Sequence, residues 1–265
     1  MKSMVNKIAK FVSNKNPDEI VRIIYLYFSS KIQNWKVIIF FKKIKNNFFQ
    51  VRFFRKHAGK NRLIFDIGAN MGNKTDIFLK LGCTVVAIEP QQDFASYLRV
   101  KYSGNKFVKV VQVALGDKEG SATINTSSIY PGFSSLNKDW QKGTKYHTFD
   151  KTEMVAMQTL DNLIDKYGLP YFCKIDVEGY ELQVIEGLHE KIPLLNFEFH
   201  SDDMKSIKDC SSKLLSLGYQ HFNFVIEENS KMALSKWVKA DELLEKITTC
   251  GGKKGITAWG DIYAK

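Results

Sequence analysis

Residues 63–89 read as a strand, a glycine turn, a helix and a second strand, and this βαβ unit limits the possible folds more than any other segment. An apolar run that ends near Asp66 leads into a turn that contains Gly68 and Gly72. Glycines let the backbone turn sharply and lie against a ligand at the N-terminus of the next helix. The second apolar strand ends on Glu89, where a carboxylate can accept hydrogen bonds from ribose hydroxyls. The segment therefore predicts a nucleotide site in an α/β sheet.

The spacing of this turn favours a cofactor that lacks phosphate. A dinucleotide fingerprint uses three glycines to admit a pyrophosphate, whereas Asn70 stands here between the two glycines and Asp66 precedes them. A carboxylate that faces the cleft repels phosphate and attracts a cation. We therefore predict S-adenosylmethionine, which has a ribose, a cationic sulfonium and an amino group but no phosphate. The alternatives are an NAD-dependent oxidoreductase and, from another class, a nucleotide-binding module without catalytic activity.

Length and cysteine content limit the domain organisation. The 265 residues, 44% of them hydrophobic, suffice for one large α/β domain with an extension. We place a basic helical extension at residues 1–60 and the cofactor-binding domain at residues 61–265. The four cysteines are far apart and include no CxxC pair, so we predict neither a zinc cluster nor a disulfide framework.

Positive charge is concentrated in the first 62 residues. This segment contains 15 Lys and Arg against two acids, whereas the rest of the chain contains 24 against 26. Its longest uncharged stretch, residues 23–30, has 8 residues, and a bilayer span needs about 20. Lys7 and Lys10 interrupt the first apolar residues, which argues against a secretory signal. The sequence thus predicts no transmembrane helix and a cytoplasmic location.

The basic extension has two interpretations that the sequence leaves open. Asn16 and Pro17 form a good helix start, and we expect two helices before Asn61. These helices either pack on the domain as a cap with solvated lysines or contact an anionic membrane as a basic amphipathic pair. Nucleic acid is not an expected partner, because the sequence contains no groove-reading or base-stacking motif.

From residue 61 onward, strand and helix patterns alternate, as a mostly parallel sheet requires. The expected strands are 62–67, 84–89, 107–114, 121–125, 154–157, 171–176, 194–200 and 255–264. The expected helices are 73–81, 91–102, 159–166, 179–188, 203–217 and 240–247, with a hairpin through 219–235. Residues 126–152 follow neither pattern and are predicted to form a substrate lid. The lid residues that suit stacking on a sugar ring are Tyr130, Phe133, Trp140, Tyr146 and His147.

Acidic residues gather at the expected strand ends. Open α/β sheets bind ligands at the carboxyl ends of their strands, where this chain has Asp66, Glu89, Asp117, Asp176, Glu178, Glu198 and also His200. A carboxylate at such a position also caps the following helix in many proteins. For Asp117 and Glu178, taken singly, the sequence favours that structural role over a functional one.

Two later segments supply candidates for proton transfer. A buried strand brings Asp176 to the sheet edge, where it either caps the next helix or orients an acceptor hydroxyl and takes its proton. Strand alternation directs Asn196, Glu198 and His200 to one face. The ordinary pKa of histidine, about 6.5, suits a proton acceptor at neutral pH, but a structural role for His200 is equally compatible with the sequence.

Six segments, taken together and in order, resemble the FkbM-type S-adenosylmethionine-dependent methyltransferases. They are FDIGANMGNKT, VVAIEPQ, VALGDKEG, MQTLDNLI, CKIDVEGYELQVIEGL and FEFH. The resemblance covers about residues 61–200. It implies a Rossmann-like class I methyltransferase fold, with a mostly parallel seven-stranded sheet and helices on both faces. It also implies O-methylation of a hydroxyl on a sugar, glycolipid or related small-molecule acceptor.

The same resemblance assigns roles to individual residues. It implies that the methionine-side loop consists of Asp66, Gly68, Ala69, Asn70 and Gly72. Glu89 would contact the ribose, Ala114 and Asp117 the adenine, and Asp176 would lie beside the methyl group. The catalytic candidates are Asp176, His200 and Glu198. A divalent cation held by Asp176 and a neighbouring carboxylate would be another way to lower the pKa of the acceptor hydroxyl, but no spacing requires it and no metal ligands are assigned.

Overall fold

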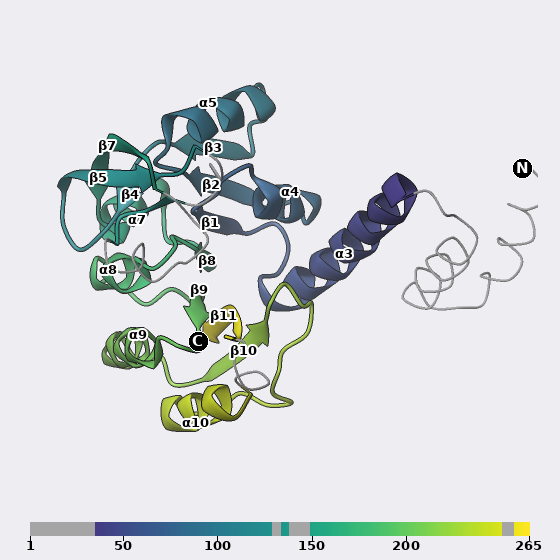
Figure 1. Cartoon of the computed structure of the whole chain (residues 1–265), viewed down its shortest axis with the longest axis vertical. Coiled ribbons are helices and arrows are strands. Elements are labelled where there is room, and N and C mark those ends of the chain that lie inside the picture. The colour runs from purple at the N-terminus through teal and green to yellow at the C-terminus, as the bar shows by residue number, and fades with distance from the viewer. Residues whose placement is uncertain (1–34, 129–133, 138–148, 251–256) are drawn as a thin grey trace, which may run out of the picture. The chain divides into compact units, whose positions relative to one another are not determined.

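The computed structural model describes residues 35–128, 134–137, 149–250 and 257–265 (Figure 1). The chain divides into two units, residues 1–53 and 54–265. Helix α3 (Trp35–His57) begins in the first unit, and the helix expected after Asn16 lies outside the described residues. Within the described ranges, no helix combines the length and apolarity that crossing a bilayer requires.

A seven-stranded sheet forms the centre of residues 54–265. Its order is β10-β11-β9-β8-β1-β2-β3, and every neighbouring pair is parallel except the two that involve β11. The strands are β1 (Leu63–Ile67), β2 (Thr84–Ile88), β3 (Val108–Val111), β8 (Phe172–Ile175), β9 (Leu194–His200), β10 (Phe222–Ile226) and β11 (Trp259–Ala264). This is the Rossmann-like class I methyltransferase fold that the sequence predicted.

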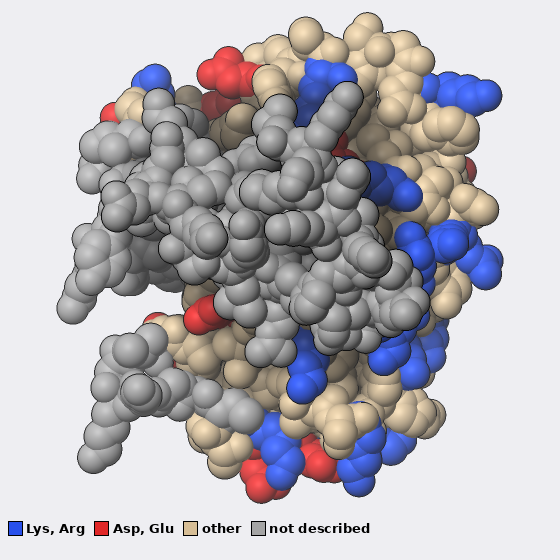
Figure 2. Space-filling model, turned by 90° about the vertical axis from the view of Figure 1, so that its right-hand side faces the viewer, with Lys and Arg blue, Asp and Glu red and all other residues tan. Residues whose placement is uncertain are grey.

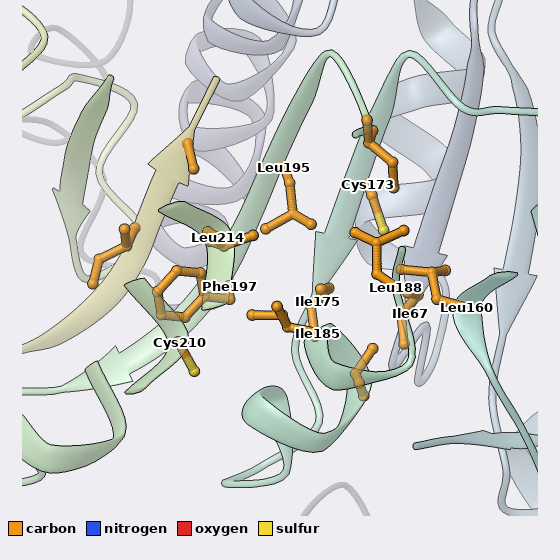
Figure 3. Close-up of a cluster of buried hydrophobic side chains, with 14 of the residues drawn as sticks. Ile67, Leu160, Cys173, Ile175, Ile185, Leu188, Leu195, Phe197, Cys210 and Leu214 are labelled. Carbon is orange, nitrogen blue, oxygen red and sulfur yellow. The ribbon is translucent and has the colours of Figure 1, made fainter. Parts of the chain in front are cut away.

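Helices cover both faces of this sheet, again as predicted (Figure 1). They are α4 (Asn73–Lys80), α5 (Gln92–Lys101), α7 (Leu160–Tyr167), α8 (Glu181–Glu186), α9 (Met204–Ser216) and α10 (Ala240–Cys250). On one face, the α4 residue Phe78 packs edge-on against Phe172 of β8. On the other face, Ile67, Ile175 and Phe197 form one apolar cluster with residues of α7 to α10 (Figure 3).

This apolar cluster positions the ends of three neighbouring strands. Ile67, Ile175 and Phe197 belong to β1, β8 and β9 and are at most 1% exposed. Each is followed directly by a residue of the site: Gly68 follows Ile67, Asp176 follows Ile175, and Glu198 follows Phe197. Because well-packed interiors resist displacement, the site residues at these strand ends are held in fixed positions.

A second sheet, of four strands, was not predicted. Its order is β4-β7-β5-β6, formed by β4 (Ala114–Leu115), β5 (Gly120–Thr126), β6 (Ser134–Ser135) and β7 (Lys151–Gln158). The expected strand 107–114 is therefore wrong as one element, since β3 and β4 belong to different sheets. The expected lid 126–152 contributes its ends and β6 to this sheet. Its five stacking candidates lie outside the described residues.

The hairpin expected through 219–235 is also wrong. The strand β10 pairs antiparallel with β11, about 35 residues later, rather than with the segment that follows it. A single bridge joins Phe222 to Val238. The local turn residues suggested a hairpin, but β11 offers five consecutive pairs and closes the edge of the main sheet.

On one face of the molecule most charged side chains are basic, whereas most of the buried charged residues are acidic. On the face that Figure 2 shows, most of the charged side chains drawn in colour are Lys and Arg. The fully buried charged residues include the acids Asp66, Glu89 and Glu181, together with Lys174. Burying a charge is costly unless it is paired or hydrogen-bonded. These buried groups therefore need such partners inside the protein.

Candidate functional site

The turn after β1 brings two glycines and Asn70 into left-handed conformations. The φ angles of Gly68, Asn70 and Gly72 are +75°, +48° and +77°. A Cβ on Gly68 would overlap the carbonyl oxygen of Asp176, and one on Gly72 would overlap the hydroxyl of Tyr102. The turns after β1 and β8 therefore lie directly against each other, which requires glycine at position 68.

Glu89 is fixed from both sides by backbone donors. It is 3% exposed and accepts a hydrogen bond from the Asn70 N–H at 2.8 Å and another from the Gln91 N–H at 3.0 Å. Burial raises the pKa of Glu89 to about 7, although these two hydrogen bonds lower it. The carboxylate thus links the glycine turn to the end of β2.

A cavity with about 670 Å³ of empty space, partly open to solvent, lies over the carboxyl ends of β1, β2 and β8. Five predicted site residues line it: Gly68, Asn70, Glu89, Ala114 and Asp176. Apolar walls come from Ile88, Val113 and Leu115. The cavity therefore combines an apolar surface for a base, a buried carboxylate for a ribose and an acid for a cation, which fits S-adenosylmethionine.

Asp66 lies under the turn rather than on the cavity wall. It is 1% exposed, and its Oδ2 accepts a hydrogen bond of 2.6 Å from the Thr75 hydroxyl of α4. Its Oδ1 is buried and has no hydrogen-bond partner among the described residues. Asp66 thus connects β1 to α4. The sequence predicted that Asp66 would face the cofactor, but it does not line the cavity.

Three other predicted cofactor residues also lie off the cavity wall. They are Ala69, Gly72 and Asp117. The N–H of Ala69 donates to the carbonyl of Ile88 at 3.0 Å, so that Ala69 helps to shape the turn. Asp117 is exposed after β4. Direct contact of these residues and of Asp66 with a cofactor stays a prediction.

Three carboxylates converge beside the cavity. One oxygen from each of Asp176, Glu178 and Glu198 lies within 4.8 Å of the others. Burial, followed by the charges of Glu198 and Asp176, raises the pKa of Glu178 to about 10. Burial and the charge of Asp176 raise the pKa of Glu198 to about 7. The two catalytic candidates Asp176 and Glu198 are therefore neighbours, as predicted from their strand ends.

His200 extends this group toward a second cavity. Its Nε2 lies 3.8 Å from Oε2 of Glu198, and this carboxylate raises the pKa of His200 although burial opposes it. Both residues line a cavity of about 890 Å³, together with Glu181 and Asp202. Asp176 lines the first cavity, so the three catalytic candidates are divided between two adjoining spaces.

Most of this chain matches one known family of proteins. Residues 66–251 match the family model described as the methyltransferase FkbM domain. The chain belongs to the FkbM methyltransferase family. It is an S-adenosylmethionine-dependent methyltransferase, and neither the NAD-dependent oxidoreductase nor the inactive binding module is retained. The match extends beyond residue 200, where the resemblance seen in the sequence ended.

Solved structures with a related fold are distant in sequence. The precorrin-6y C5,15-methyltransferase of Geobacter metallireducens GS-15 is 10% identical, with 83% of this chain and 86% of that chain covered and a TM-score of 0.41. A putative sarcosine dimethylglycine methyltransferase of Galdieria sulphuraria is 8% identical, with coverage of 92% and 97% and a TM-score of 0.42. A putative hemolysin of Streptococcus thermophilus is 12% identical, with coverage of 82% and 65% and a TM-score of 0.41. No curated protein matches the sequence.

Within this FkbM-family site, the sequence analysis missed Lys174. It is 3% exposed, and its Nζ donates to Oδ2 of Asp176 at 2.7 Å. Burial acts to lower the pKa of Lys174, but the carboxylates of Asp176, Asp66 and Asp261 outweigh burial and raise it. The available signal was a single charged residue inside the otherwise apolar strand FCKI.

The contacts of β6 and of Asn137, which follows it, were also missed. The Ser135 hydroxyl donates to the carbonyl of Glu178 at 2.5 Å, and the Asn137 amide donates to the carbonyl of Gly179 at 2.7 Å. The Gln91 side chain donates to the Ser134 hydroxyl at 2.9 Å. This segment therefore connects the turn after β2 with the turn after β8. No sequence pattern shows a connection between residues more than 40 positions apart.

Proposed function

We propose that this FkbM methyltransferase transfers a methyl group to a hydroxyl of a sugar, a glycolipid or a related small-molecule acceptor. The observation that carries the proposal is the position of Asp176. It lines the cofactor cavity, and its carboxylate lies among those of Glu178 and Glu198. One acid is thus placed to serve both the methyl donor and a hydroxyl nucleophile.

The donor side would be held by residues of the first cavity. S-adenosylmethionine supplies an activated methyl group on a positively charged sulfonium when it is bound. Glu89 would accept hydrogen bonds from the ribose hydroxyls, and Gly68 lets the turns after β1 and β8 meet at the cavity wall. The negative charge of Asp176 stabilises a cation at the inner end of the cavity.

The acceptor side requires alignment and removal of one proton. A C–O bond forms as the C–S bond breaks, and the hydroxyl proton passes to Asp176, which leaves a methyl ether and S-adenosylhomocysteine. General base catalysis contributes about 10²- to 10⁴-fold. His200 and Glu198 line the neighbouring cavity, where they would orient the acceptor and accept the proton from Asp176 at a later stage.

A divalent cation is a second way to activate the hydroxyl at this place. Hard cations such as Mg²⁺ bind carboxylate oxygens, and Asp176, Glu178 and Glu198 would be the ligands. Such an ion would lower the pKa of a hydroxyl. Calorimetric titration of the protein with Mg²⁺, repeated with Glu178→Gln, tests this possibility. Binding that is lost in the variant supports the ion, and equal binding or none by the wild-type protein excludes it at this cluster.

Transfer of labelled methyl groups tests the proposed function. The purified protein is incubated with methyl-labelled S-adenosylmethionine and a panel of sugars, glycolipids and hydroxylated small molecules, and the labelled products are identified by mass spectrometry. An O-methyl ether is expected. Labelling of nitrogen or carbon atoms instead, with hydroxyl acceptors left unlabelled, would show that the assigned acceptor chemistry is wrong.

The basic residues 1–60 keep two interpretations, membrane contact and a helical cap. Flotation of the full chain with neutral vesicles and with vesicles containing anionic phosphatidylserine distinguishes them. Binding only to anionic vesicles, lost when residues 1–55 are deleted, is the result expected for a membrane contact. A truncated chain that becomes insoluble, while the full chain ignores both kinds of vesicle, is expected for a packed cap.

A further inference from the structure

Lys174 is a buried lysine in the middle of the parallel sheet. It is the third residue of β8 and is 3% exposed. Asp66 of β1 and Asn196 of β9 are its direct neighbours in register, so the three side chains point to the same face of the sheet. A buried ammonium costs several kcal/mol of desolvation unless charged partners compensate for it. An apolar residue at this position would avoid that desolvation cost.

The ion pair of Lys174 with Asp176 is asymmetric. Nζ lies 2.7 Å from Oδ2, and the lysine side chain is 4% exposed whereas the aspartate side chain is 34% exposed. The ammonium thus holds the carboxylate from the interior, while Asp176 lines the cofactor cavity on its other side. Oδ1 is the oxygen that carries no bond to the lysine.

We propose that Lys174 is the positioning residue of the methyl-transfer site, which holds Asp176 by Oδ2 and so presents Oδ1 to the acceptor. The inference rests on the proposed function, because it takes Asp176 as the group that meets the acceptor hydroxyl. Lys174 is not among the described residues that line either cavity. It therefore acts through Asp176 and touches neither cofactor nor acceptor.

The alternative to this proposal is a purely structural lysine. Asp66 is buried opposite Lys174, and loss of the ammonium would leave this second acid without a nearby buried cation. A structural role predicts that substitution weakens folding and cofactor binding together. A positioning role predicts that cofactor binding survives and that turnover is lost. Crystal structures and kinetic measurements distinguish these two outcomes.

Crystal structures with S-adenosylhomocysteine provide a test that needs no acceptor. In the wild-type complex, we expect Lys174 on Oδ2 of Asp176 with Oδ1 toward the cavity. In Lys174→Met, we expect the cofactor in the same place and the Asp176 carboxylate turned away from its wild-type position. An unchanged Asp176 in Lys174→Met, or a wild-type complex in which Lys174 contacts another group, overturns the proposal.

Kinetics provide the second test, with any acceptor that the wild-type enzyme methylates. Lys174→Met should lower kcat about 100-fold, because misplacement by about 1 Å costs that much, while KM for S-adenosylmethionine changes less than about threefold. In an Asp176→Asn background, the same substitution should change kcat less than about twofold, since residues that act through one another are not additive. A wild-type kcat, or equal losses in both backgrounds, contradicts a role through Asp176.

Two further variants serve as a substitute and as a control for the kinetic test. Lys174→Gln keeps an N–H donor without the charge and serves if Lys174→Met does not fold, as judged by its thermal unfolding. Lys205→Met is the matched control, because Lys205 forms a 2.8 Å ion pair with Asp209 on the exposed surface of α9, and it should keep wild-type turnover. Failure of the wild-type enzyme to methylate any hydroxyl refutes the proposed function alone, because the crystal structures still decide the position of Asp176.

Discussion

Glu89 and Asp176 each follow a parallel strand of the same sheet and line the same cavity, yet their surroundings differ. Glu89 is held by two backbone N–H groups from the turns beside it. Asp176 is held by the buried ammonium of Lys174 and lies among other carboxylates. Backbone donors remain after most side-chain substitutions, whereas an ion pair is lost with a single one. The donor half of the site should therefore tolerate mutation better than the acceptor half.

The largest effect is expected from Asp176→Asn. Removal of the base should lower kcat about 1000-fold, within the range for general base catalysis, while the Kd of S-adenosylhomocysteine changes less than about threefold. Methyl-transfer assays and calorimetric titration measure the two quantities. Asp209→Asn, which alters an exposed ion pair of α9, is the control and should leave both unchanged. Equal turnover in Asp176→Asn would place the base elsewhere and remove the contrast between the two halves.

A smaller effect, on the donor side, is expected from Glu89→Gln. An amide NH₂ would face one of the two backbone donors, and the loss of charged hydrogen bonds costs about 2 kcal/mol, which weakens S-adenosylhomocysteine about 30-fold. Glu153→Gln is the matched control, because Glu153 accepts the Gln92 N–H at 3.0 Å on the exposed surface. Calorimetry measures both affinities. An unchanged affinity in Glu89→Gln would show that the ribose is held by other residues.

The pH dependence of cofactor binding should follow Glu89. Because its pKa lies at about 7, the free protein binds a proton at Glu89 as the pH falls below 7. Ribose hydroxyls donate to the ionised carboxylate, so the affinity should fall about tenfold between pH 8 and pH 6. Titrations with S-adenosylhomocysteine at both pH values measure this change. The Glu89→Gln variant should lack it, and an equal pH dependence in the variant would assign it to another group.

The smallest effect is expected from Ser135→Ala, which tests the connection between the two halves. The Ser135 hydroxyl donates to the carbonyl of Glu178, and a hydrogen bond of this kind contributes about 1 kcal/mol, or about fivefold in kcat. Ser216→Ala removes a comparable bond to the carbonyl of Lys213 at the exposed end of α9 and should leave turnover unchanged. Equal effects of both substitutions would mean that β6 does not organise the acceptor side.

The segment β1-α4-β2 shows how far local sequence predicts this fold. Its boundaries agree within one or two residues with the prediction, because apolar periods and two left-handed glycines are local properties. The place of Glu89 followed from the same signals, whereas the seven-stranded sheet followed from the family resemblance. The division of 107–114 into β3 and β4 did not, since the segment is mostly apolar and contains no glycine or proline that would mark a break. The pairing of β4 with β7, about 43 residues later, decides it.

The sequence alone determined the family, the cofactor class and the strand ends at which the acidic residues lie, because each depends on short segments that can be read one by one. Only the tertiary structure decided where each acid lies relative to the others. The face that α4 covers places Asp66 in the interior with Thr75. The packing of β8 between β1 and β9 places Lys174 behind Asp176 and brings Glu198 beside it. Such placements depend on contacts between distant segments, and those contacts exist only once the sheet has formed.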